Sequence, residues 1–215
     1  MGSVGFIGGA ISVAAGSVLV PRGDDLANIA EMQEVFGEQA VLLQASALLI
    51  SFGFWATLAG TLAVRRTIDA EGADWAHLGF VFHGIGIALW TVGMSLDISY
   101  PAAIVAFRQA SPENRDIAYG VVTVLSPQGF GRGLFPLNLI VNWLSFGLLS
   151  VGIIISRRPA RWVGWVGVAI GVAGVLLGVA MTFTGREALI TGFLVLMACT
   201  LLWWLSLGIT LRRRE

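Results

Sequence analysis

Residues 155–174 read ISRRPARWVGWVGVAIGVAG and join a short basic turn to a glycine-rich apolar segment. The turn contains Arg157, Arg158 and Arg161. The segment that follows, about 162–182, has the length of roughly 20 residues that crosses a hydrocarbon core. An arginine cluster next to such a segment is typical of the cytoplasmic end of a membrane-spanning helix. The stretch therefore predicts a helical membrane protein.

The rest of the chain repeats this pattern. Of its 215 residues, 56% are hydrophobic and 12% are charged, whereas soluble domains carry about 25% charged residues. Five other apolar stretches lie at about 4–20, 40–64, 76–96, 136–156 and 188–211. We therefore predict an all-α fold, a polytopic transmembrane helix bundle with about six spanning helices in a single domain, 1–215.

The arginine clusters predict the orientation of the bundle. Arginine resists translocation, so clusters in short loops mark the cytoplasmic side. With six spans, the pair Arg65 and Arg66, the turn at 157–161 and the cluster 212–214 all lie on one side, together with both termini. The opposite side is then acidic, with Asp24, Asp25, Glu31, Glu34, Glu38, Asp97, Glu113, Asp116 and Glu187.

Two segments on the acidic side are longer than turns. Residues 21–39 have apolar positions at helical spacing with acids between them, which predicts an amphipathic helix along the membrane surface. Residues 97–135 are expected to form two short helices, one opening at Pro101 and one after Ser111-Pro112, followed by a flexible GFGRG at 129–133. Connections of this length are commonly functional, and a lid and a docking surface are equally compatible with the sequence.

Glycines in the fifth apolar stretch alternate at steps of three and four, which places them on one helical face. They are Gly164, Gly167, Gly171, Gly174 and Gly178. Small residues let helix backbones approach closely in lipid. The stripe predicts glycine-zipper packing within the chain, with a homodimer seam as the alternative.

His83 and Trp90 share a face of the third apolar stretch with several glycines, which points the imidazole towards other helices. Polar groups inside a membrane are costly and often functional. An interhelical hydrogen bond is the simplest interpretation of His83. The alternative is an axial ligand for a haem or chlorophyll-type tetrapyrrole. His77 lies on a different face, which disfavours a bis-histidine site within one chain.

A polar stripe, Asn138, Asn142 and Ser145, runs along the fourth stretch. It is interpreted first as helix-to-helix contact and second as the wall of a small cavity. Gln44 and Asp97 have a similar expected depth. We therefore hypothesise that they converge with the asparagines on a polar pocket that opens to the outer side.

Several classes of function have no support in the sequence. All thirteen basic residues are arginine, so a lysine Schiff base cannot form. The single cysteine, Cys199, cannot form an internal disulfide, and no catalytic or metal-binding motif occurs. The net charge of zero does not favour nucleic-acid binding. The sequence predicts no metal, requires no cofactor and leans against an enzyme.

Three features are similar to a bacterial family of six-helix membrane proteins of unknown function. They are VPRGDDLANIAEM at 20–32, the arginine pair at 65–66 and the stretch 155–174 quoted above. The resemblance implies a bacterial inner-membrane protein and carries over no catalytic residue. The segment 97–135 departs from the family's pattern.

We therefore expect a non-catalytic, multi-pass membrane protein. Its expected partners are the lipid bilayer and either other membrane subunits or a second copy of this chain in a homodimer. It is predicted to act as an accessory subunit of a complex or to bind a hydrophobic small molecule. The first alternative is a pigment binder that uses His83. The second is a small transporter or intramembrane enzyme with the outward-facing polar pocket.

Overall fold

The computed structural model describes residues 2–21, 29–126, 129, 131–185 and 189–213. In these residues all regular secondary structure is helical, and six helices are long and apolar enough to cross a membrane. This confirms the predicted fold class. The six are α1 (Gly2–Leu19), α3 (Ala40–Thr67), α4 (Ala70–Gln109), α6 (Gly131–Ser156), α7 (Arg161–Thr184) and α8 (Ile190–Arg212). The shorter elements are α2 (Ile29–Glu38), the 3-10 turn η1 (Pro112–Asn114) and α5 (Arg115–Leu125).

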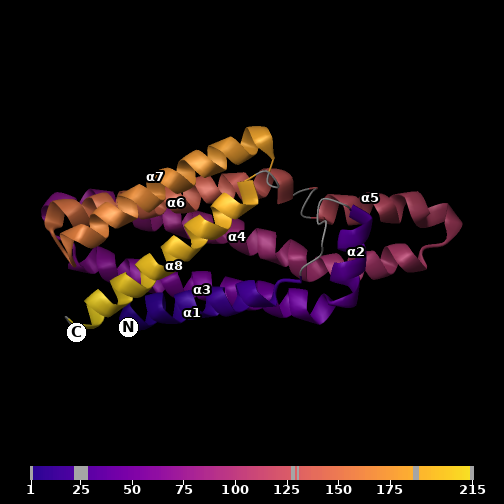
Figure 1. Ribbon diagram of the computed structural model, residues 1–215, viewed down its shortest axis with the longest axis horizontal. Coiled ribbons are helices and arrows are strands. Elements are labelled where there is room, and N and C mark those ends of the chain that lie inside the picture. The colour runs from indigo at the N-terminus through magenta and orange to yellow at the C-terminus, as the bar shows by residue number, and fades with distance from the viewer. Residues whose placement is uncertain (1, 22–28, 127–128, 130, 186–188, 214–215) are drawn as a thin grey trace.

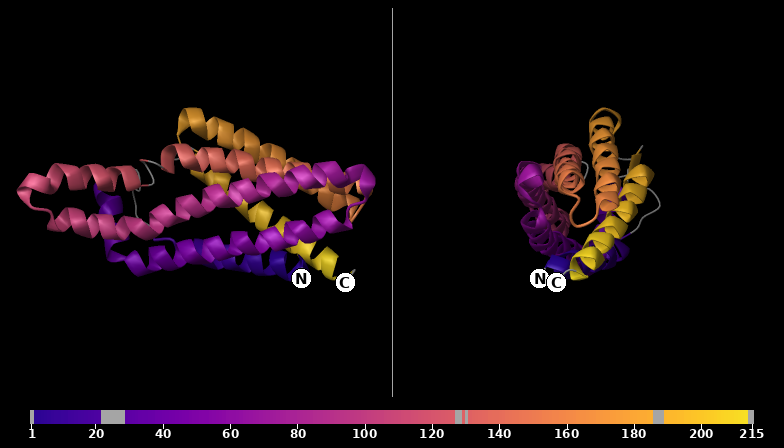
Figure 2. Two further views of the ribbon diagram at one scale, coloured as in Figure 1. Left: turned by 180° about the vertical axis from the view of Figure 1, so that it is seen from behind. Right: turned by 90° about the vertical axis from the view of Figure 1, so that its left-hand side faces the viewer.

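The six long helices form a closed ring. Each packs on the next along the chain, from α1 and α3 through α4, α6 and α7, and α8 returns to α1. Figure 1 shows α8 crossing the bundle obliquely, and the end-on view in Figure 2 shows its tilt against the other helices. Both chain ends lie at the same end of the bundle.

α4 differs most from the sequence prediction. We expected a helix to end near residue 96 and a new one to open at Pro101, but α4 continues through this proline to Gln109 and has 40 residues. At 1.5 Å per residue it is about 60 Å long, twice the ~30 Å of a hydrocarbon core. Gln44 Nε2 of α3 donates to the Ile98 carbonyl, 3.1 Å away, in the turn before the proline. Pro101 removes the helical donor to the Asp97 carbonyl, and the Gln44 contact lies one residue further along the same turn.

The extension of α4 forms a small cap with α2 and α5. Met32 and Phe36 of α2, Tyr100 and Ile104 of α4 and Val122 of α5 are buried together in a separate apolar cluster. Only one of the two short helices expected in 97–135 is separate, α5 with the turn η1. Three residues of the expected flexible GFGRG, 131–133, belong to the first turn of α6. We call this end of the bundle the capped end.

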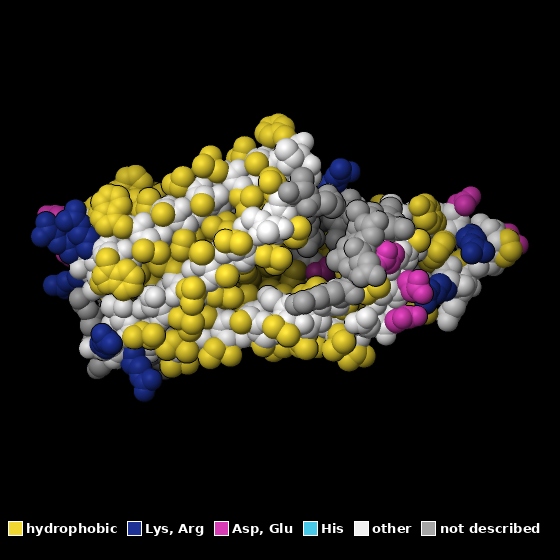
Figure 3. Space-filling view, viewed as in Figure 1, with side chains coloured by type: hydrophobic (Ala, Val, Ile, Leu, Met, Phe, Trp, Pro, Cys, Tyr) yellow, Lys and Arg dark blue, Asp and Glu magenta, His cyan; other side chains and the backbone are white. Residues whose placement is uncertain are grey.

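The opposite end carries the arginine clusters named in the sequence analysis and is called the basic end. Antiparallel packing brings Arg65 and Arg66, the link 157–161 and Arg212 to this end, and Figure 3 shows arginines gathered there and acidic side chains on the cap. Four residues named in the charge prediction, Asp24, Asp25, Glu187 and Arg214, lie outside the described residues.

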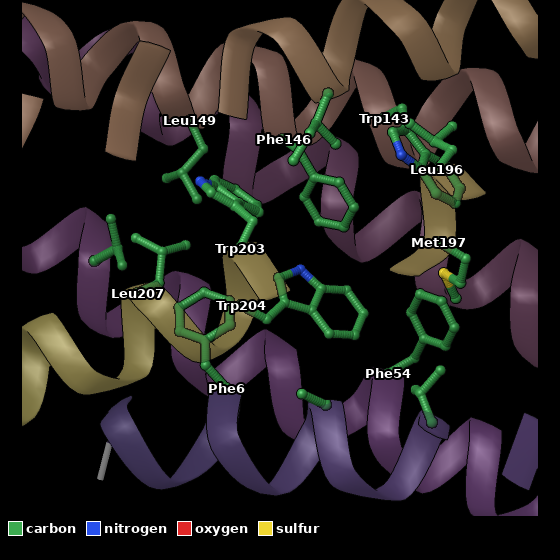
Figure 4. Close-up of a cluster of buried hydrophobic side chains, with 14 of the residues drawn as sticks. Phe6, Phe54, Trp143, Phe146, Leu149, Leu196, Met197, Trp203, Trp204 and Leu207 are labelled. Atoms are coloured by element: carbon green, nitrogen blue, oxygen red, sulfur yellow. The ribbon is translucent and has the colours of Figure 1, made fainter. Parts of the chain in front are cut away.

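Aromatic side chains fill the centre of the ring towards the basic end. Figure 4 shows Trp203 and Trp204 of α8 pointing inward, where Trp204 packs against Phe54 and Phe146 with ring centroids 5.5 and 5.7 Å apart. Sequence position near a span end suggests a tryptophan at the membrane surface, but both tryptophans are buried. The oblique path of α8 directs them into the core. Trp162 and Trp165 are exposed, as expected for a membrane interface.

The glycine stripe of α7 lies against α6. A methyl group added at Gly171 would lie 2.7 Å from Gly147 Cα, and one at Gly164 would lie 2.9 Å from the Ser150 carbonyl oxygen. Gly174 lies against the Trp143 side chain and Gly178 against Ile140, whereas Gly167 contacts Ser150 and Trp203. The backbones of α6 and α7 thus approach closely along this face.

Candidate functional site

A cavity of about 600 Å³ lies inside the ring, in the half towards the capped end. Its wall is mostly apolar. The polar side chains in it are Ser17, Ser46, Asp97, Ser126 and Asn138. Figure 3 shows a hollow in the surface between α8 and α1, with an acidic side chain inside it. The volume falls within the range of about 300–1,000 Å³ that is typical of small-molecule sites.

The cavity exists because α8 and α1 diverge. At the basic end they are in close contact, since a methyl group at Gly208 would lie 3.0 Å from the Ser3 carbonyl oxygen. Towards the capped end, Val13 of α1 and Phe193 and Met197 of α8 line the cavity from two separate walls. Figure 1 shows the two helices separating along this direction. The gap between them faces the side of the bundle, where a membrane protein meets lipid.

The cap covers the outer end of the cavity. Phe36 of α2, Leu125 at the end of α5 and the adjacent Ser126 all belong to its lining. Ser126 is held in place, because its hydroxyl donates to the Thr123 carbonyl and accepts from the Gly129 amide. Part of the segment 97–135 therefore forms one end of the cavity wall.

The polar stripe of α6 begins at the cavity and continues into the core. Asn138 lines the cavity and is 3% exposed. Asn142, fully buried one turn further, donates its amide to Asn138 Oδ1 and, at 3.3 Å, to the Asn138 carbonyl. Gly86 of α4 provides the space for Asn142, since a methyl group there would lie 2.6 Å from the carboxamide. Ser145 turns its hydroxyl back to the Asn142 carbonyl at 2.5 Å.

His83 lies at the centre of the ring. Its Nε2 is 3.0 Å from the Thr57 hydroxyl of α3, and its ring packs 5.2 Å from that of Phe146. The Asn142 carboxamide is its other polar neighbour. Nδ1 of His83 and Oδ1 of Asn142 have no hydrogen-bond partner in the described part of the chain. A hydrogen bond between them requires the proton on Nδ1, and Nε2 would then accept from the Thr57 hydroxyl, which also lies 2.6 Å from the Phe54 carbonyl.

The contacts of His83 can be compared with what an axial ligand of a tetrapyrrole pigment requires. An axial ligand must offer a ring nitrogen to a metal beside a large flat space, but His83 is completely buried and does not line the cavity. Its Nε2 is engaged with Thr57. The geometry therefore matches the simpler interpretation of His83 as an interhelical contact.

The polar residues that were expected to form one pocket lie partly in the cavity wall and partly elsewhere. Trp90, Asp97 and Asn138 line the cavity, whereas Gln44 and Asn142 do not. Gln44 is used by the α4 backbone before Pro101. The hypothesis rested only on the similar depth at which these residues were expected to lie in the membrane. In the ring, the helix faces that carry Gln44 and Asn142 do not border the cavity.

The apolar wall of the cavity is what sequence reasoning missed. Phe36, Phe193 and Met197 carry no pattern that distinguishes them from ordinary core residues. A second, polar cavity of about 450 Å³ lies at the basic end and is lined by Arg65, Arg66, Ile68, Ala73, Asp74 and His77. In the described residues, no group of three or more His, Cys, Asp or Glu side chains is placed to hold a metal ion.

Comparisons with protein-family models, curated proteins and solved structures found no match to this chain.

Proposed function

We propose that this protein is a multi-pass membrane protein that binds an uncharged hydrophobic small molecule taken up from the bilayer. The observation that carries the proposal is the largely apolar cavity of about 600 Å³ between α1 and α8. Burial of apolar ligand surface supplies the binding energy in such sites, and a few polar groups fix the orientation. Asn138 and Asp97 are suited to this second role.

The walls of the cavity support entry from the lipid. Val13 and Ser17 of α1 face Phe193 and Leu194 of α8 across the gap, and both helices are apolar enough to lie in the hydrocarbon core. The cap, by contrast, covers the water-facing end with Phe36 and Leu125. A lipid-soluble molecule can therefore reach the cavity sideways without leaving an apolar medium.

Gly93 offers a direct test. It lines the cavity, and a methyl group there would meet only Leu134, at an ordinary 3.7 Å. Gly93→Leu should therefore fill the cavity without disturbing the helix contacts. Gly84→Leu is the matched control, because Gly84 lies on the same helix and a methyl group there would meet nothing within 4 Å.

The measurement is equilibrium dialysis of durene (1,2,4,5-tetramethylbenzene) against lipid nanodiscs that contain the protein, with empty discs as the correction for partition into lipid. Wild type and Gly84→Leu should retain durene above the empty discs, and Gly93→Leu should not. Equal retention by Gly93→Leu and wild type would contradict the proposal.

We also propose that the basic end faces the cytoplasm and that the protein is located in a bacterial inner membrane, as the positive-inside rule and the family resemblance imply. Single cysteines at Arg66 and at Glu113, in a Cys199→Ala background, test the orientation. A membrane-impermeant thiol reagent applied to whole cells should label the position at Glu113 only. Labelling of the position at Arg66 would reverse the assignment.

A role as an accessory subunit is the second candidate. Its support is an apolar stripe on α5, where Ile117, Val121 and Val124 are 70%, 48% and 58% exposed and share one helical face. Such a stripe outside the membrane is a common mark of an interface. Affinity purification in mild detergent would test it. A lone monomer in that preparation would count against a stable complex and leave ligand binding unaffected.

A further inference from the structure

The carboxamide of Asn138 is a polar group in the cavity wall that can form a hydrogen bond with a ligand. Asn138 is 97% buried in a wall that is mostly apolar, and its Oδ1 already accepts a hydrogen bond from Asn142. A carboxamide has one acceptor oxygen and one NH2 group that donates. Within the described residues the Asn138 oxygens accept from Asn142 while the Asn138 NH2 group makes no hydrogen bond. The NH2 group is therefore the part of this side chain that lacks a partner, and it requires an acceptor.

The packing of α4 against α6 shows which residue of α4 lies opposite Asn138 along the helix axes. Gly86 lies beside Asn142, and Gly93 lies beside Leu134. Asn138, halfway between these two contacts on α6, is therefore level with Trp90 on α4. Trp90, Phe135 and Phe193 all line the cavity, and Phe135 packs against both other rings, with centroids 6.2 and 5.0 Å away. The donor thus lines the same cavity as three packed aromatic rings.

The charges of the cavity lining indicate which kind of acceptor group the ligand carries. The described lining residues include the acid Asp97 and no arginine, lysine or histidine. An anionic head, such as a phosphate or carboxylate, would have to be desolvated in this wall without a positive partner, which is costly. An uncharged oxygen acceptor has no such cost.

From these observations we propose that the ligand is an uncharged, flat, lipid-soluble carbonyl compound of the quinone class. Its ring lies against the aromatic rings of the cavity, and a carbonyl oxygen accepts a hydrogen bond from Asn138 Nδ2. Asn142 acts as a positioning residue, because its bond to Oδ1 fixes which edge of the Asn138 carboxamide faces the cavity. This inference rests on the proposed function and adds the chemical class of the ligand.

The test compares three probes with the same methylated ring. Durene has no oxygen, duroquinone (tetramethyl-1,4-benzoquinone) has two carbonyl groups, and 2,3,5,6-tetramethylbenzoate is an anion. Retention of each by nanodiscs that contain the protein is corrected with empty discs. Wild type should bind duroquinone roughly tenfold more tightly than durene, as expected for one buried hydrogen bond, and should not retain the benzoate.

Asn138→Leu should lower the affinity for duroquinone to that for durene while retention of durene persists, which also shows that the variant has folded. Equal binding of both neutral probes by wild type would overturn the quinone assignment and leave the hydrophobic-ligand function intact. Preferential binding of the benzoate would overturn it as well. Failure of all three probes to bind would contradict the proposed function itself. Because the wild-type comparison needs no variant, poor folding of Asn138→Leu does not weaken the test.

Discussion

The basic half and the capped half of the ring are built from the same helices but are packed differently. In the basic half, glycines bring backbones together, as at Gly79 of α4, where a methyl group would lie 2.6 Å from the Leu149 amide nitrogen of α6. In the capped half of the same two helices, a methyl group at Gly93 would find its nearest neighbour, Leu134, at 3.7 Å. Along α4 and α6, the basic half is closed by backbone contacts, and the capped half borders the cavity.

The difference shows how a membrane protein can combine stability with an open site. Helices in lipid gain little from hydrophobicity and depend on close packing. The contacts of α6 with α7 and the buried aromatic cluster of Trp204, Phe54 and Phe146 provide such packing. Because these contacts hold the ring together, α8 can diverge from α1 over the other half of its length.

The largest effect is expected where two backbones touch. A methyl group at Gly171 would lie 2.7 Å from both Gly147 Cα and Gly147 N, which no side-chain rotation can relieve. Gly171→Ala should lower the free energy of unfolding by about 2–3 kcal/mol. The change can be measured by titration with sodium dodecyl sulfate in mild-detergent micelles, followed by tryptophan fluorescence. Gly84→Ala, in open space on α4, should stay within about 0.5 kcal/mol of wild type. Equal losses of unfolding free energy in Gly171→Ala and Gly84→Ala would mean that α6 and α7 do not pack as described.

A medium effect is expected at the centre of the ring. Thr57→Val keeps the shape of the side chain but removes the hydroxyl 3.0 Å from His83 Nε2. We expect a loss of about 1 kcal/mol, within the range of interhelical hydrogen bonds in membranes. Thr182→Val is the control, since the Thr182 hydroxyl donates only to the Gly178 carbonyl of its own helix. The same unfolding titration should distinguish the two variants.

A smaller and more local effect is expected beneath the cap. Gln44→Leu removes the hydrogen bond to the Ile98 carbonyl before Pro101. The expected loss is about 0.6 kcal/mol. Hydrogen exchange should become faster in the α4 segment around Pro101 and remain unchanged at Gly79. Uniformly faster exchange along α4 would show that the bond supports the whole helix instead.

The smallest effect is expected beside the cavity. Gly93→Ala should change the free energy of unfolding by less than about 0.5 kcal/mol, because the added methyl group meets an ordinary contact distance. Gly79→Ala, two helical heptads away on the same face, should be clearly destabilising in the same titration. If Gly93→Ala were equally destabilising, the capped half would be as tightly packed as the basic half.

The sequence determined the large features well for physical reasons. Apolar length and arginine position depend on the bilayer and not on neighbouring helices, so six spans and the shared basic end could be predicted. The continuation of α4 could not, because proline normally ends a helix and the side-chain contact next to Pro101 comes from Gln44, 54 residues from Ile98. The site was only half predictable. Trp90, Asp97 and Asn138 were recognised as polar or aromatic residues inside the membrane, whereas Val13, Phe193 and Met197 became wall residues only through the tilt of α8.

The unbroken course of α4 also has a mechanical consequence. One rod carries Trp90 in the cavity wall, Tyr100 in the cap cluster and Gly79 in the backbone contact with α6. The α4 part of the cap therefore cannot swing away from the bundle without moving the most closely packed part of the ring. Exchange of an occupant would then depend on sideways bending of α8, and its rate should depend on the lateral pressure of the surrounding lipid.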